Sequence, residues 1–178
     1  MVIKKATPFT KPRSPAYTRK SKKRALNFIK GWLPPKIQKY AMGNLEAYNS
    51  GKLNTLIKLV SEAAMQVRDN ALEASRKQIL RELDKKVGKS NYYFSIVSYP
   101  HQVLRENKVL TGAGADRLSK GMQQAFGSVV GNAALIRPGD TLFLVASTKE
   151  FINPIREILK KTFPKIPGKK RIDVEIKE

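Results

Sequence analysis

The residues best suited to binding chemistry lie between Arg105 and Arg137, in a basic stretch that is punctuated by glycine. Glycine lets a backbone adopt positive φ and approach a ligand closely, and cationic side chains attract anions. Strand-like runs end near Leu104 and resume near Ala133, whereas hairpin loops usually hold only ~2–5 residues. The pattern predicts a scaffold that presents a basic binding loop at about residues 108–131. The residues that define it are Gly112, Gly114, Gly121, Gly127, Lys108, Arg117 and Lys120.

Motifs for catalysis or cofactor binding are missing. His101 is the only histidine, and its place at a strand end favours a surface or RNA-contacting side chain over a catalyst. Lys120-Gly121 lacks the upstream glycine and the following Ser or Thr of a P-loop. Gly112-Ala-Gly114 begins like a dinucleotide-binding turn, but Arg117 occupies the position of the third glycine. No carboxylate pair has a spacing that suggests acid–base work. We therefore expect no catalytic residue, no cofactor and no metal site.

The excess of positive charge limits the kinds of binding partner that suit this chain. The 178-residue chain has 35 Lys and Arg against 14 Asp and Glu, with a formal net charge of +21 and a pI near 10.3. A bound polyanion relieves such self-repulsion, and nucleic acid is the commonest polyanion. A solvated, highly soluble surface and an anionic membrane surface are the alternatives. No run approaches the ~20 apolar residues of a membrane span, and no apolar signal segment opens the chain.

Cysteine is absent, which excludes disulfides, thiolate zinc sites and cysteine nucleophiles and fits a reducing compartment.

Positive charge is concentrated at the N-terminus. Twelve basic residues precede the first acidic residue, Glu46, and prolines prevent one continuous helix. Tyr17, Phe28 and Trp32 lie among these charges, where their rings can stack on bases. We expect residues 1–35 to be a basic extended segment that orders on RNA. An organelle transit peptide is the alternative for this segment, although the prolines argue against it. For Phe28 and Trp32, the alternative to base stacking is packing against the core of the domain.

The rest of the chain alternates strand and helix signals. Strand patterns cover residues 36–42, 55–61 and 92–98, with a turn at 44–53. A long helix is expected from Ser61-Glu62 to about Val87, where Gly88 suits its end. Later, residues 132–136 and 141–147 read as a hairpin around Pro138-Gly139-Asp140.

Two further elements complete the scaffold. A helix capped by Thr148 should cover residues 149–161, and residues 171–177 should form an edge strand. Strands outnumber helices without alternating with them, so residues 36–178 should form a single α+β domain with a largely antiparallel sheet and two main helices.

The glycine-rich stretch carries a family resemblance. Residues 111–127 closely resemble the hallmark loop of the large-subunit ribosomal protein family called L-ten-e in archaea and eukaryotes, equivalent to bacterial L-sixteen. The resemblance spans most of the chain from about residue 34. Its specific parts are Ala113 to Leu118, Gly121-Met122 and Ala125-Phe126-Gly127, with Pro100, Val103, Arg105, Asn107, Lys108, residues 71–76 and residues 35–37 as further matches.

This resemblance implies a fold and a role. Family members have an α+β fold of the α/β-hammerhead type and bind large-subunit rRNA beside the path of the A-site tRNA. Their loop reaches toward the peptidyl transferase centre and the tRNA acceptor region. They are not enzymes, and they act in the cytoplasm as one copy per ribosome beside neighbouring ribosomal proteins. An RNA-modifying enzyme is the alternative, but it would need a cofactor site.

The candidate site residues follow from the charge pattern and the resemblance. Arg117 and Lys120 are expected to contact tRNA or rRNA backbone, with Asp116 orienting Arg117; in the alternative, Asp116 and Arg117 only order the loop itself. The rRNA-binding candidates are Lys4, Lys5, Lys11, Arg13, Tyr17, Arg19, Lys20, Lys22, Lys23, Arg24, Lys36, Arg105 and Lys108. The loop candidates facing tRNA and the peptidyl transferase centre are Gly112, Gly114, Asp116, Arg117, Lys120, Gly121, Met122 and Gln123.

The sequence also departs from the family pattern. Gln123-Gln124 stands where the family has Arg-Gly, Ser128-Val129 where it has Lys-Pro, and Leu135 where it has arginine. His101 replaces an aromatic residue, and Gln102 a histidine. Three positive charges, at Gln123, Ser128 and Leu135, are thus missing from the second half of the loop. Their absence weakens the expectation of phosphate contacts in that half, although glutamines can hydrogen-bond sugars and bases. The diverged N-terminus favours an archaeal-type protein.

Overall fold

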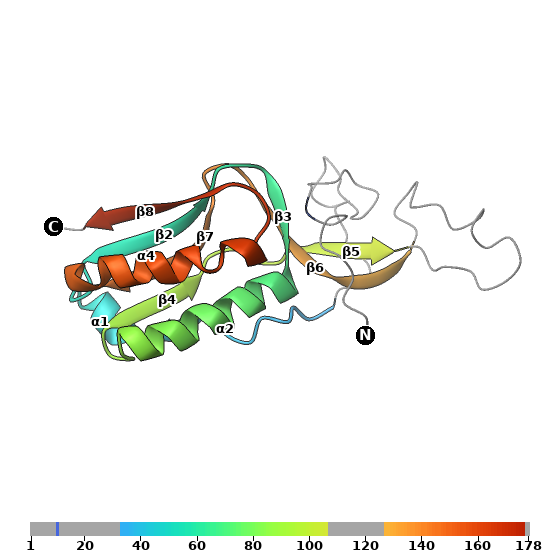
Figure 1. The fold of residues 1–178 in the computed structure, drawn as a ribbon. Coiled ribbons are helices and arrows are strands. Elements are labelled where there is room, and N and C mark those ends of the chain that lie inside the picture. Colours follow the sequence, from blue (N-terminus) through green and yellow to red (C-terminus); the bar gives the residue numbers. More distant parts are fainter. Residues whose placement is uncertain (1–9, 11–32, 107–126, 177–178) are drawn as a thin grey trace, which may run out of the picture.

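Two antiparallel sheets and two long helices make up the part of the chain that the computed structural model describes, namely Thr10 and residues 33–106 and 127–176 (Figure 1). The five-stranded sheet has the order β1-β4-β7-β2-β8, and the three-stranded sheet has the order β3-β6-β5. The α+β class is therefore confirmed. The strands are β1 (Ala41–Gly43), β2 (Thr55–Ser61), β3 (Met65–Arg68), β4 (Tyr92–Ile96), β5 (Gln102–Glu106), β6 (Ser128–Ile136), β7 (Thr141–Ser147) and β8 (Lys170–Ile176). The helices are α1 (Leu45–Asn49), α2 (Asp69–Lys86) and α4 (Ile152–Lys160), with 3-10 turns η3 (Lys149–Phe151) and η4 (Phe163–Lys165).

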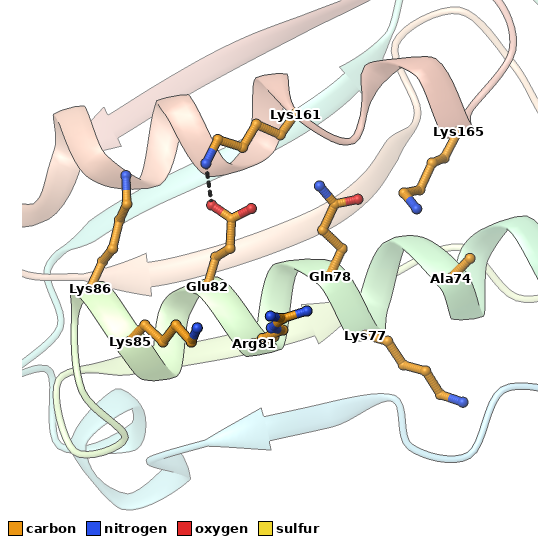
Figure 2. A pocket seen from close by; sticks show the side chains of 9 residues that line it. All are labelled: Ala74, Lys77, Gln78, Arg81, Glu82, Lys85, Lys86, Lys161 and Lys165. Carbon is orange, nitrogen blue, oxygen red and sulfur yellow. Dashed lines mark hydrogen bonds and ion pairs between the residues drawn. The ribbon is translucent and has the colours of Figure 1, made fainter.

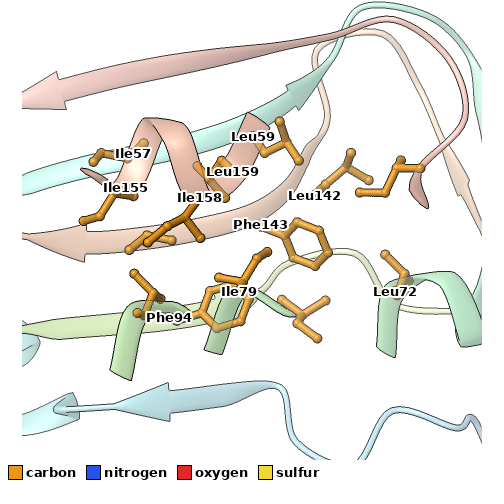
Figure 3. Close-up of a cluster of buried hydrophobic side chains, with 14 of the residues drawn as sticks. Ile57, Leu59, Leu72, Ile79, Phe94, Leu142, Phe143, Ile155, Ile158 and Leu159 are labelled. Carbon is orange, nitrogen blue, oxygen red and sulfur yellow. The ribbon is translucent and has the colours of Figure 1, made fainter. Parts of the chain in front are cut away.

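The core lies between one face of the five-stranded sheet and the helices α2 and α4 (Figure 3). Phe94 and Phe143 are both fully buried, with ring centroids 5.8 Å apart. Ile79 of α2 and Ile155 and Ile158 of α4 are also fully buried and cover this face. Burial of each such side chain stabilises the folded state by roughly 1.5–3 kcal/mol. The packing fixes both helices against the sheet.

The expected start of the long helix was wrong. Ser61 ends β2, and β3 intervenes before α2 begins at Asp69. Met65 and Val67 are buried on β3, so their spacing of two residues reflects a strand. The expected end was right: the chain leaves the helix at Gly88, whose φ of +86° suits glycine.

The expected hairpin between residues 132–136 and 141–147 was also wrong. β6 pairs with β3 and β5, whereas β7 pairs with β2 and β4, so the two strands belong to different sheets. The turn between them docks on the end of β2, because the Gly139 N–H donates to the Ser61 carbonyl at 2.7 Å and the Ser61 N–H to the Asp140 carbonyl at 3.0 Å. The turn thus carries the chain from one sheet to the other.

Smaller differences concern element ends. Of the strand expected at 36–42, only Ala41 and Met42 lie in β1, and the turn expected at 44–53 contains α1. The helix after Thr148 starts with η3, and the Thr148 side chain makes no capping bond. β8 is an edge strand, as expected.

Candidate nucleic-acid interface

The three-stranded sheet, hereafter the anchoring sheet, extends to one side of the helices (Figure 1). Its strands β5 and β6 pair from Gln102–Ala133 outward to Glu106–Ser128. The chain leaves β5 after Glu106 and returns at β6, so the two ends of the predicted loop are held opposite each other. β6 already begins at Ser128, which corrects the loop boundary of 108–131: residues 128–131 belong to the strand.

A bulge lies near the outer end of this pair. Leu104 pairs with Gly131 but Arg105 pairs with Val129, so β6 has one extra residue there. A bulge increases the local twist and redirects the side chains beside it. Arg105, a predicted rRNA contact, is half-buried at this position. The bulge therefore bends β6 opposite Arg105.

The base of the anchoring sheet holds residues 33–37. Asn132 of β6 is fully buried, and its side-chain amide donates to the Leu33 carbonyl. The carboxylate of Asp69, which is 4% exposed, accepts the Lys36 N–H at 3.3 Å and the Asn70 N–H at 2.7 Å. The Lys36 side chain is exposed. The chain is thus fixed where it leaves the basic N-terminal region.

A third attachment lies on β3, at the edge of the anchoring sheet. The Gln66 N–H donates to the Thr10 carbonyl at 2.8 Å. An edge strand offers unpaired backbone groups, which another segment can satisfy. Thr10 lies within the predicted basic segment, so this segment has attachment points on the anchoring sheet at both Thr10 and Leu33.

A buried ion pair supports the same region from α2. Arg76 donates to both carboxylate oxygens of Glu73, at 2.6 and 2.8 Å, and these side chains are only 6% and 10% exposed. This hydrogen bond lowers the pKa of the Glu73 carboxyl, against the opposing effect of burial. The Arg76 guanidinium also contacts Met42 Sδ at 3.2 Å and Gln38 Oε1 at 3.5 Å. It therefore attaches residues 38–42 to the helix.

Of the predicted site residues, the described part of the chain contains only Lys36 and Arg105. The other N-terminal and loop candidates, from Lys4 to Arg24 and from Lys108 to Gln123, lie outside the described residues. Sequence reasoning missed Asp69, Asn132 and the Glu73–Arg76 pair. Only the pair had a readable signal, a carboxylate and a guanidinium three residues apart on a helix.

The described residues contain neither a cluster of metal-ligating side chains nor an apolar helix of membrane-spanning length. No group of three or more His, Asp or Glu side chains there could hold a metal ion. None of the described helices combines the length and the apolar character that crossing a membrane requires. His101 is exposed, with Nδ1 2.9 Å from the Tyr99 carbonyl oxygen.

Known proteins resemble this chain over almost its whole length. Residues 12–173 match the family model described as ribosomal protein L16p/L10e. The large ribosomal subunit protein uL16 of Hyperthermus butylicus is 42% identical over 98% of this chain and 94% of its own length. The proteins of the same name from Halobacterium salinarum and Pyrobaculum islandicum are 39% and 38% identical, over 98% and 100% of this chain and 96% and 94% of theirs.

Proposed function

Because this chain belongs to the L16p/L10e family of ribosomal proteins, which are structural and not enzymes, we propose that it is a constituent of the large ribosomal subunit that binds large-subunit rRNA. The archaeal relatives support an archaeal-type protein that works in the cytoplasmic ribosome. Its partners are then rRNA and neighbouring ribosomal proteins, with one copy in each particle.

One structural observation carries the rRNA-binding proposal. Thr10 and Leu33 are hydrogen-bonded to the anchoring sheet, and Lys36 is hydrogen-bonded to the start of α2 beside it. The same sheet holds both ends of residues 107–126. Two basic segments that are distant in the sequence therefore start from one small sheet. With a net charge of +21, such a surface suits the phosphate-rich junctions of folded RNA.

This arrangement gives the N-terminal segment and the domain different roles in rRNA binding. Residues 1–35 form a basic extended segment that contacts rRNA through its lysines, arginines and Tyr17. Residues 36–178 form one rRNA-binding domain, in which Lys36 and Arg105 add charge next to the anchoring sheet. Phosphate contacts of this kind fix position and orientation rather than read base sequence.

The loop has a separate role in this proposal. Gly112, Gly114 and Gly121 let the backbone approach the tRNA acceptor region near the peptidyl transferase centre. Arg117 and Lys120 contact RNA backbone there, and Asp116 orients the Arg117 guanidinium. Peptide-bond chemistry itself is left to the RNA, and the protein only positions groups around it.

Salt dependence tests the rRNA proposal. A protein that neutralises 6–10 phosphates loses about 10³–10⁵-fold in affinity between 50 and 200 mM salt. We expect the purified chain to show this loss with archaeal large-subunit rRNA. Equal binding at both salt concentrations would contradict the proposal.

Arg117→Ala tests the loop. Ribosomes carrying this variant should assemble normally but synthesise peptide more slowly, because the lost contact lies beside the reacting substrates. Arg137→Ala is the matched control, since Arg137 is exposed and lies outside the loop. If the two variants support equal rates of synthesis, the loop is not in contact with the translation substrates.

A further inference from the structure

A basic groove runs between α2 and the end of α4, with η4 at one side (Figure 2). Its volume is about 780 Å³. Only Ala74 among its lining residues is apolar, and only Glu82 is acidic. The cations that line it are Lys77, Arg81, Lys85, Lys86, Lys161 and Lys165.

Three of these cations are paired within the protein. Lys161 bridges to Glu82 at 2.7 Å, which ties α4 to α2 and lowers the pKa of the Glu82 carboxyl. Lys86 lies 3.2 Å from Glu157, and Lys77 lies 3.7 Å from Glu73, outside the groove. The single acid of the groove is therefore already neutralised.

The remaining cations, Arg81, Lys85 and Lys165, are exposed and form no ion pair with any residue that the structure describes. Lys77, Arg81 and Lys85 follow one another at intervals of four residues on one face of α2, where like charges destabilise a helix. The helix forms despite the repulsion between these cations. A bound anion would remove it.

We propose that this groove binds an RNA phosphate backbone, as a second contact surface in addition to the anchoring sheet. Two features favour RNA over an acidic protein segment. Protein interfaces rely on buried apolar and aromatic anchors, which this groove lacks, whereas a patch of clustered lysines and arginines is typical of nucleic-acid-binding surfaces. Four residues of helix advance about 6 Å, so the cations of α2 form a row that can follow successive phosphates along a strand.

The inference rests on the proposed rRNA binding, and it is tested in the full-length chain. The groove variant carries Arg81→Gln, Lys85→Gln and Lys165→Gln. The control carries Lys149→Gln, Arg156→Gln and Lys160→Gln, three exposed cations of η3 and α4 that do not line the groove. Each variant loses three positive charges, so a general effect of net charge on RNA binding is the same in both.

Binding of archaeal large-subunit rRNA is measured against salt. Each neutralised phosphate contributes ~0.7–0.9 to the slope of log affinity against log salt, so the groove variant should lose about 2–3 units of slope relative to the control. Thermal unfolding by circular dichroism checks that both variants are folded. A polyglutamate peptide is the probe for an acidic protein partner.

The outcomes separate the two proposals. Equal slopes for the groove variant and the control would overturn the groove assignment, while a steep wild-type slope would leave rRNA binding standing. Absence of salt-dependent binding in the wild type would overturn both. Loss of polyglutamate binding with unchanged rRNA binding would also overturn the assignment, in favour of a protein partner.

Discussion

Removing one member of the buried Glu73–Arg76 pair should destabilise the protein strongly. Glu73→Leu would leave the Arg76 guanidinium, 6% exposed, without the two hydrogen bonds of 2.6 and 2.8 Å that now satisfy it. Breaking a buried pair in this way costs about 3–5 kcal/mol. For a chain of this size, a loss of about 3 kcal/mol lowers Tm by roughly 6–12 °C.

The assay is a double-mutant cycle measured by urea unfolding. Arg76→Met should cost about as much as Glu73→Leu, because it leaves the carboxylate buried alone. The double variant should recover most of the loss, since apolar side chains of similar volume can replace a buried pair at little cost. Lys77→Met is the control: this lysine is 62% exposed and 3.7 Å from Glu73, and such a pair contributes at most about 1 kcal/mol.

Two results would contradict a buried, coupled pair. Losses below about 1 kcal/mol for both single variants would mean that water still reaches the pair. Additive losses in the double variant would mean that the two side chains act independently, contrary to their geometry.

Three more predictions concern stability. The pKa of the Glu73 carboxyl is lowered from its ordinary 4.5, so its contribution is fully present above about pH 4.5 and disappears as pH falls through the lowered value; Glu73→Leu should flatten this acid-side decline in unfolding free energy. Asn132→Ala should cost about 1 kcal/mol in urea unfolding, because the hydrogen bond from its side-chain amide to the Leu33 carbonyl is lost, and an unchanged midpoint would contradict this. Gly43→Ala should cost more than about 1 kcal/mol, because φ is +89° and the new Cβ would overlap the Tyr92 carbonyl; a thermal melt equal to wild type would rule the clash out.

Sequence patterns predicted the elements with strong local signals. The run of β-branched and leucine residues at β2, the alternation at β8 and the glycine after α2 all lie where expected. β5 and the later part of β6 lie where strand-like runs were expected on either side of the loop, but β3 and its pairing with β6 in a separate sheet were not foreseen. β3 has only four residues beside a long helix and its partner β6 lies about seventy residues away in sequence, so short-range periodicity assigned it to the helix.

The candidate site was predictable in its charges but not in its supports. The lysines and arginines before Glu46 can be read directly from the sequence, and they indicate a polyanionic binding partner. The side chains that hold this segment, Asp69 and Asn132, are single polar residues whose roles depend on contacts 33 and 99 positions away. No local pattern marks such residues. The groove between α2 and α4 likewise exists only because packing brings Lys161 and Lys165 beside α2.

The decisive measurement is whether the chain is bound to the large ribosomal subunit in the cell. The full-length chain, tagged and expressed in an archaeal cell, would be followed by quantitative mass spectrometry through a sucrose gradient and a high-salt wash. We expect one copy in each large particle and in translating ribosomes. A chain that sediments apart from the large particle in cells that are making protein would contradict it.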